Sequence, residues 1–64
     1  MIERGDEVHH IPTGENWVVL RAGVDSAGEF VEPAGWPPCR ARAADCVLTK
    51  KGVHVAFLDR HEST

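Results

Sequence analysis

Short runs of alternating apolar and polar residues, separated by glycine and proline, make up most of this 64-residue chain. In the run 6–11, Val8 alternates with polar neighbours, which is typical of a half-buried strand. The run 16–22 is apolar on both faces, as in a strand at the centre of a sheet. Between them, residues 12–15 (PTGE) supply the fixed φ and the flexible glycine of a tight turn. The pattern therefore predicts a first hairpin whose second strand is central.

Two further strands follow from the same alternation. Residues 24–28 predict a turn, 29–32 a short third strand and 46–49 a fourth. Three prolines exclude regular structure from 33–38, because each one fixes φ and removes a backbone donor. Residues 40–45 fit a single helical turn that leads into the fourth strand.

The stretch VHVAFL (53–58) is ambiguous between two elements. Its alternation predicts a fifth strand. A helix over 53–60 is the competing interpretation, since the same apolar residues also fit one or two helical turns. Gly52 and the two valines favour the strand.

No segment shows apolar spacing of 3.6 over twelve or more residues, so the architecture is predicted to be all-β. About five short antiparallel strands, with one helical turn before a late strand, predict a small SH3-like barrel that forms a single domain over 1–64. We expect a core of Val8, Trp17, Val19, Phe30, Trp36, Leu48, Val55 and Phe57, with Cys46 as a small filler.

Size and hydropathy limit what the domain can do. A chain this short buries only about 60% of the surface that its unfolded form exposes, which leaves little stability for a catalytic cleft. We therefore do not expect an enzyme. No apolar stretch approaches the roughly 20 residues that span a bilayer, and residues 1–6 lack the apolar core of a signal peptide. We expect a cytoplasmic protein in which Cys39 and Cys46 are free, buried thiols rather than a disulfide.

The net charge of −3 conceals an asymmetry along the chain. Residues 1–39 hold two basic and seven acidic side chains, whereas 40–51 hold four basic and one acidic. An acidic half disfavours nucleic-acid binding, which depends on neutralising several phosphates together. A nucleic-acid role is thus an alternative to a protein-binding one, and it would use the basic side chains of 40–51: Arg40, Arg42, Lys50 and Lys51.

The adjacent histidines His9 and His10 suggest a metal site that strand geometry opposes. Neighbouring residues on a strand point to opposite faces, so at most one of the two faces inward, as a hydrogen-bonded barrel residue. A zinc-stabilised domain is a further alternative, with the candidate ligands Cys39, Cys46, His10 and His54. Six residues separate the cysteines, however, and there is no C-x-x-C motif. We therefore predict no metal and no other cofactor.

The aromatic and basic residues around 36–42 are the candidate binding surface. Trp36 stands beside Pro37-Pro38, which suits a groove for a peptide, although a second role for Trp36 in the core stays open. Aromatic and arginine side chains are enriched at interface hot spots. The sequence therefore predicts a non-enzymatic protein-interaction module that binds a partner through Trp36, Pro37, Pro38, Arg40 and Arg42. Homodimerisation through an open barrel edge or the predicted C-terminal strand is compatible with this role and with both alternatives.

Three stretches of the chain carry a resemblance to known proteins. The run GDEVHHIPTGENWVV (5–19), the element GWP (35–37) and the stretch AADCVL (43–48) resemble a group of small uncharacterised bacterial and prophage-type proteins. The opening Gly-Asp-x-Val is also loosely similar to the YodC-like family and to Tudor-like and CarD-type barrels. The resemblance implies an SH3-like barrel without an assigned activity, with Cys46 as a structural residue and His10 in the first hairpin. Because CarD-type barrels bind RNA polymerase, it also implies an RNA-polymerase-associated role as an alternative.

Overall fold

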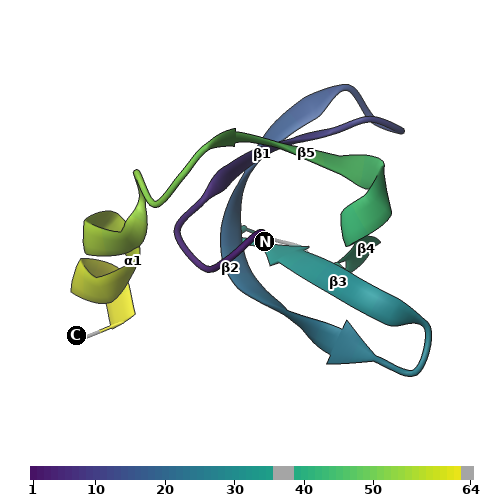
Figure 1. Ribbon diagram of the computed structural model, residues 1–64. Helices are drawn as coiled ribbons and strands as arrows, with labels where there is room; N and C mark the ends of the chain where they lie inside the picture. The colour runs from purple at the N-terminus through teal and green to yellow at the C-terminus, as the bar shows by residue number, and fades with distance from the viewer. Residues whose placement is uncertain (36–38, 63–64) are drawn as a thin grey trace.

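The computed structural model describes residues 1–35 and 39–62, and within them the chain forms five strands, one 3₁₀ turn and one helix (Figure 1). All strand pairings are antiparallel, in the order β4-β3-β2-β1-β5. The small all-β, SH3-like architecture predicted from the sequence is thereby confirmed. The elements are β1 (Glu7–His10), β2 (Glu15–Asp25), β3 (Gly28–Pro33), β4 (Ala41–Arg42), η1 (Ala43–Asp45), β5 (Cys46–Lys50) and α1 (Val55–Glu62).

Strand β2 is shared between the two halves of the sheet. Its first half pairs with β1, and its second half pairs with β3, with a register shift between Val19 and Arg21. The shift bends the strand, so the sheet curls and its two edge strands, β4 and β5, are connected by η1 (Figure 1). The Ile11 amide donates to the Asp45 carbonyl at 2.9 Å and fastens the first hairpin to this corner. The predicted central position of the second strand is confirmed.

A small apolar cluster fills the concave side of the sheet. Val8, Val19 and Val31 are fully buried, and the half-buried side chains packed around them are Ile2, Trp17, Ala22, Ala43 and Cys46. The prediction of Val8, Val19 and Phe30 as buried residues is confirmed, whereas Trp36 lies outside the described residues. Val31 and Leu58 are buried without having been predicted.

Three predicted core residues are exposed instead. Leu48, Val55 and Phe57 expose 40%, 37% and 54% of their surface. Leu48 lies on β5, an edge strand that pairs with β1 on one side, so no neighbouring strand covers its side chain from the other side. Val55 and Phe57 lie on a helix that turns one narrow face to the barrel.

The predicted strand over 53–58 is wrong, because this segment begins α1. Gly52, with φ of 67°, turns the chain out of β5, and the Leu58 amide then donates to the His54 carbonyl at 3.0 Å. Leu58 is buried, and Val55, one turn before it, packs against Gly5. Tertiary contact with the N-terminal segment therefore overrides the β preference of the two valines.

Smaller corrections concern the ends of the elements. The second strand continues through Val24 to Asp25, so the turn predicted over 24–28 contains two residues, Ser26 and Ala27. Pro33 ends β3 opposite Val19, although it was predicted to lie outside regular structure. A strand end tolerates proline, because little of the ladder depends on its missing donor. The predicted helical turn is confirmed as η1. The two-residue strand β4, which was not predicted, comes directly before it and brings the number of strands in the sheet to five.

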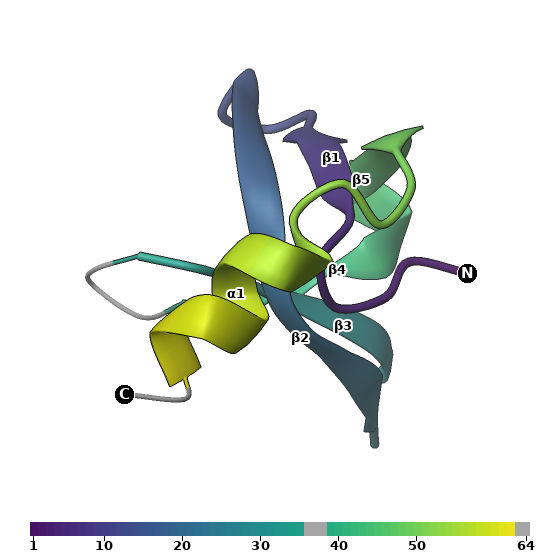
Figure 2. The same cartoon turned by 90° about the vertical axis from the view of Figure 1, so that its left-hand side faces the viewer.

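Helix α1 lies at one end of the barrel beside the segment that leads into β1 (Figure 2). It is short, and none of the helices in the described part of the chain is long and apolar enough to cross a membrane.

Candidate functional site

A cluster of arginines and carboxylates covers the outer face of β2, β3 and β4. Successive residues on a strand alternate between faces, so Asp25 lies on the side of Gly23, and Glu32 on the side of Phe30. The cross-strand pairs are Gly23 with Phe30 and Phe30 with Arg42. We call this set the arginine cluster, and its members are Arg21, Asp25, Phe30, Glu32, Arg40 and Arg42.

Arg42 binds Asp25 through both ends of its guanidinium. Its Nη1 donates to Oδ1 at 2.9 Å and its Nη2 donates to Oδ2 at 2.7 Å, the two-pronged geometry that arginine makes with a carboxylate. These hydrogen bonds hold the pKa of Asp25 well below its ordinary value and raise the pKa of Arg42. The pair ties the short edge strand β4 to the far end of β2.

Arg40 lies over the ring of Phe30. Its guanidinium carbon is 3.7 Å from the ring centroid, a cation–π contact, and its Nε and Nη2 donate to Glu32 Oε2 at 3.0 and 2.9 Å. The ring also lies against Gly23, where a Cβ would be 2.9 Å from Phe30 Cζ. Its contacts with Gly23 and Arg40 explain why an outward-facing phenylalanine is buried.

Glu32 receives a second cation from β2. Arg21 Nη2 lies 2.7 Å from its Oε1, so the carboxylate joins Arg40 and Arg21. The hydrogen bond from Arg40, with the charge of Arg21 beside it, lowers the pKa of Glu32 despite some desolvation. The carboxylates of the arginine cluster are therefore ionised over the physiological pH range.

A hollow of about 510 Å³ adjoins the arginine cluster, and we call it the β3–β4 hollow. Gly35 and Cys39, the residues directly before and after 36–38, both line it. Apolar surface comes from Leu20 and Pro33. Among the described residues, the lining is Leu20, Arg21, Glu32, Pro33, Gly35, Cys39 and Arg40.

The predicted partner-binding residues fall into two groups. Arg40 and Arg42 both belong to the arginine cluster. Trp36, Pro37 and Pro38 lie outside the described residues.

The four basic residues of the nucleic-acid alternative have separate environments. Arg40 and Arg42 are bound to carboxylates beside β4. Lys51 follows the opposite edge strand, where its Nζ donates to the Met1 carbonyl, to Glu3 Oε1 and to Asp6 Oδ2 at 2.8, 3.0 and 3.1 Å. Lys50 is exposed at the end of β5. Three of the four positive charges are thus matched by carboxylates of the same chain.

The two adjacent histidines point to opposite faces, as predicted. His10 is buried, stacks on Trp17 with ring centroids 4.0 Å apart, and places its Nδ1 2.8 Å from Thr13 Oγ1. His9 lies on the other face with its Nδ1 2.9 Å from Asn16 Oδ1. The stack of His10 on Trp17 and the contact of His9 with Asn16 link the two strands of the first hairpin, so the observed role of both histidines is structural.

The candidate zinc ligands occupy different parts of the barrel. His54 pairs with Glu7 at 3.2 Å, and the Cys46 thiol lies 3.7 Å from the Arg42 carbonyl. Burial and the charge of Asp45 raise the pKa of Cys46. Both cysteines are free, but neither is buried as predicted, since Cys39 is exposed and Cys46 is half-buried. Within residues 1–35 and 39–62, no three histidine, cysteine or acidic side chains are close enough together to hold one metal ion.

Asp6 is a buried carboxylate that the sequence analysis did not single out. It accepts hydrogen bonds from the amides of Gly52 and Glu3 at 2.7 and 2.8 Å, in addition to that from Lys51. Burial by itself would raise the pKa of Asp6, but these hydrogen bonds outweigh it and hold the pKa below its ordinary value. Asp6 thus joins the N-terminal segment to the turn that follows β5. The sequence signal for this role was its place in the Gly-Asp opening.

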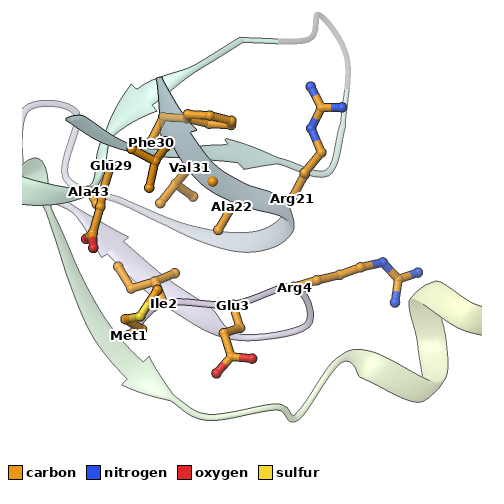
Figure 3. A pocket seen from close by; sticks show the side chains of 12 residues that line it. Met1, Ile2, Glu3, Arg4, Arg21, Ala22, Glu29, Phe30, Val31 and Ala43 are labelled. Carbon is orange, nitrogen blue, oxygen red and sulfur yellow. The ribbon is translucent and has the colours of Figure 1, made fainter. Parts of the chain in front are cut away.

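The open end of the barrel forms a second hollow, of about 570 Å³ (Figure 3). Ile2 reaches into it toward Val31 and Ala22, and its side chain packs on the apolar cluster. Arg4 points away toward α1, where its Nη1 donates to Asp59 Oδ1 at 2.7 Å. The N-terminal segment thus lines this hollow and contacts the helix at the same time.

No protein-family model, curated protein or solved structure matches the chain. The assignment of a function rests on the geometry of the arginine cluster and of the hollow beside it.

Proposed function

We propose that the chain is a non-enzymatic protein-interaction module whose binding surface is the β3–β4 hollow. Trp36, Pro37 and Pro38 join the proposed surface from the sequence alone, as the segment between Gly35 and Cys39. The supporting observation is the combination of apolar surface and a fixed guanidinium in one concave patch. Such a patch suits a partner segment that inserts an apolar side chain beside a polar contact.

Arg40 is the side chain that best suits a partner contact. Glu32 and the ring of Phe30 already fix it, so little conformational entropy remains to be lost when a partner binds. Its side chain is nevertheless 40% exposed, which leaves part of the guanidinium accessible. Arg42 is assigned a positioning role, because its guanidinium is held by Asp25.

Leu20 supplies the apolar part of the surface. It lies on β2 with its side chain on the opposite face from the buried Val19, and 37% of its surface is exposed. A half-exposed leucine in a hollow gains most from a partner that covers it, since burial of apolar area contributes about 25 cal/mol per Å².

A pair of matched variants tests the proposal. Leu20→Glu introduces a charge into the hollow, and Val24→Glu places the same charge at a more exposed position on the same strand, outside the hollow. Wild type and both variants are immobilised, proteins retained from a lysate are identified, and the affinity of each purified candidate is measured by calorimetry. We expect Leu20→Glu to abolish binding and Val24→Glu to retain it, with both variants folded by circular dichroism.

Equal binding by the two variants would place the contact elsewhere and refute the proposed surface. Trp36→Ala is the companion test: a folded variant that binds weakly supports a role at the surface. An unfolded variant makes Trp36 a core residue and removes it from the proposal.

A further inference from the structure

The outer edge of β5 presents free backbone groups. The Ile11 amide donates to the Asp45 carbonyl, and the pairs that follow are Cys46 with His10, Val47 with His9 and Leu48 with Val8. Hydrogen-bonded pairs alternate in an antiparallel ladder, so Val47 bonds to β1 while the backbone groups of Leu48 point to the other side. The Cys46 amide donates to Ala43 instead of β1, as this alternation requires. Among the described residues, no backbone group satisfies the outward N–H and C=O of Leu48.

Apolar side chains accompany this free edge. Val47 exposes 51% of its surface on one face of β5, and Leu48 exposes 40% on the other. Leu48 also lines a hollow of about 580 Å³ together with Met1, Ile2 and Ala44. Space and apolar surface therefore lie next to the free edge on the concave side of the sheet.

The charges of β5 lie at its ends and have opposite signs. Asp45 precedes the strand and Lys50 ends it, while the residues between them, CVLT, are uncharged. Edge strands that avoid pairing usually carry a charge or a proline within the strand. In β5 an antiparallel copy would place each Asp45 beside the Lys50 end of its neighbour, whereas a parallel copy would bring like charges together.

We propose that β5 pairs antiparallel with β5 of a second copy of this chain across a two-fold axis, which joins the two sheets into one. A two-fold axis perpendicular to the sheet brings a residue with outward backbone groups opposite itself. Leu48 fulfils this condition, so the two Leu48 residues exchange N–H···O=C hydrogen bonds and cover each other's side chains. The same register places Cys46 opposite Lys50 of the second copy and sets the acidic end of each strand beside the basic end of the other.

This inference goes beyond the proposed function and does not depend on it. The described residues that line the β3–β4 hollow lie on β2, on β3 and in the connection from β3 to β4, and none lies on β5, so dimerisation through β5 leaves the hollow open and presents two copies of it.

Charge exchange tests the dimer without altering the core, because Asp45 and Lys50 are both exposed. Lys50→Glu gives a strand that is acidic at both ends, and Asp45→Lys gives one that is basic at both ends. Self-association of wild type, of each variant and of an equimolar mixture is measured by sedimentation equilibrium. In this register Asp45 lies opposite Lys51, next to Lys50, so each exchange brings like charges close together at both ends of the paired strands. We therefore expect each variant to associate severalfold more weakly than wild type.

The mixture is the decisive sample. In a heterodimer of the two variants, both ends again pair unlike charges, so association should return to the strength of wild type. Slower hydrogen exchange of the Leu48 amide at high concentration of wild type is the independent readout. A wild type that stays monomeric, or a dimer that neither variant weakens, would overturn the inference. A monomer that still binds its partner through Leu20 would overturn the dimer and leave the proposed function standing.

Discussion

Val55, the first residue of α1, occupies the space that a side chain on Gly5 would need. A Cβ at Gly5 would overlap Val55 Cγ2 and lie 3.0 Å from the Val55 backbone nitrogen. The His54 amide donates to the Gly5 carbonyl at 2.8 Å in the same place. The helix is therefore docked on the backbone of the N-terminal segment, and the glycine of the Gly-Asp opening permits this close approach.

Gly5→Ala should destabilise the chain by about 2 kcal/mol or more, because it combines a left-handed φ of 91° with the overlap at Val55. Gly14→Ala is the matched control, since Gly14 also has a positive φ, of 71°, but has open space around it. Urea unfolding monitored by circular dichroism gives both values. Equal losses in the two variants would show that the contact with Val55 contributes nothing.

Asp6→Asn should cost about 2 kcal/mol, because an amide cannot accept all the hydrogen bonds that converge on the carboxylate and its own N–H groups face donors. The variant should also lose part of the acid sensitivity. A lowered pKa in the folded state means that Asp6 stabilises the fold above its ordinary pKa of 3.8, and that this contribution is lost as the pH falls below that value. Unfolding curves between neutral and acidic pH should therefore converge for wild type and variant. Curves that stay parallel would contradict the prediction.

Arg40→Ala should lower the melting temperature more than Arg21→Ala does. Both side chains pair with Glu32, but Arg40 also pairs with Asp25 at 3.3 Å and covers the ring of Phe30. Its loss exposes the ring in addition to breaking two ion pairs, whereas exposed ion pairs alone contribute little. Thermal unfolding in low and high salt separates the two effects, since salt screens the ion pairs and leaves the loss of ring burial unchanged. Similar melting temperatures for the two variants would count against the stacking contact.

Leu58→Ala should destabilise the chain by roughly 2–4 kcal/mol and reduce the helical signal, because Leu58 is the buried anchor of α1. Val53→Ala, just before the helix, serves as the control, since Val53 is more than half exposed. Far-UV circular dichroism together with urea unfolding measures both quantities. An unchanged helical signal in Leu58→Ala would mean that α1 is held by other contacts.

The strands were predictable from the sequence because each one is specified locally. Alternation around Val8 and the PTGE turn are sufficient for the first hairpin, and the Gly14 amide closes it on the His10 carbonyl at 2.9 Å. The helix was not predictable in this way, because the apolar residues of 53–58 fit both the two-residue period of a strand and the 3.6-residue period of a helix. The contact that decides between them, Val55 on Gly5, joins opposite ends of the sequence.

Two members of the arginine cluster, Arg40 and Arg42, were predicted from the sequence as site residues, whereas their partners were not. Arg40 and Arg42 are recognisable as a basic pair, but their partners Asp25 and Glu32 lie on two other strands. Which carboxylate meets which guanidinium depends on the registers of β2 with β3 and of β3 with β4. The sequence therefore indicates a basic segment, whereas the fold pairs its arginines with carboxylates and places Arg40 over Phe30.

The hydrogen bond from Gly52 to Asp6 spans 46 positions and closes most of the chain into one loop. Because closing a long loop costs more entropy than forming a hairpin, the two hairpins around β2 are expected to form first. Helix α1 then arrives last in folding and detaches first in unfolding, so its amides should exchange with solvent through a partial opening that leaves the barrel intact.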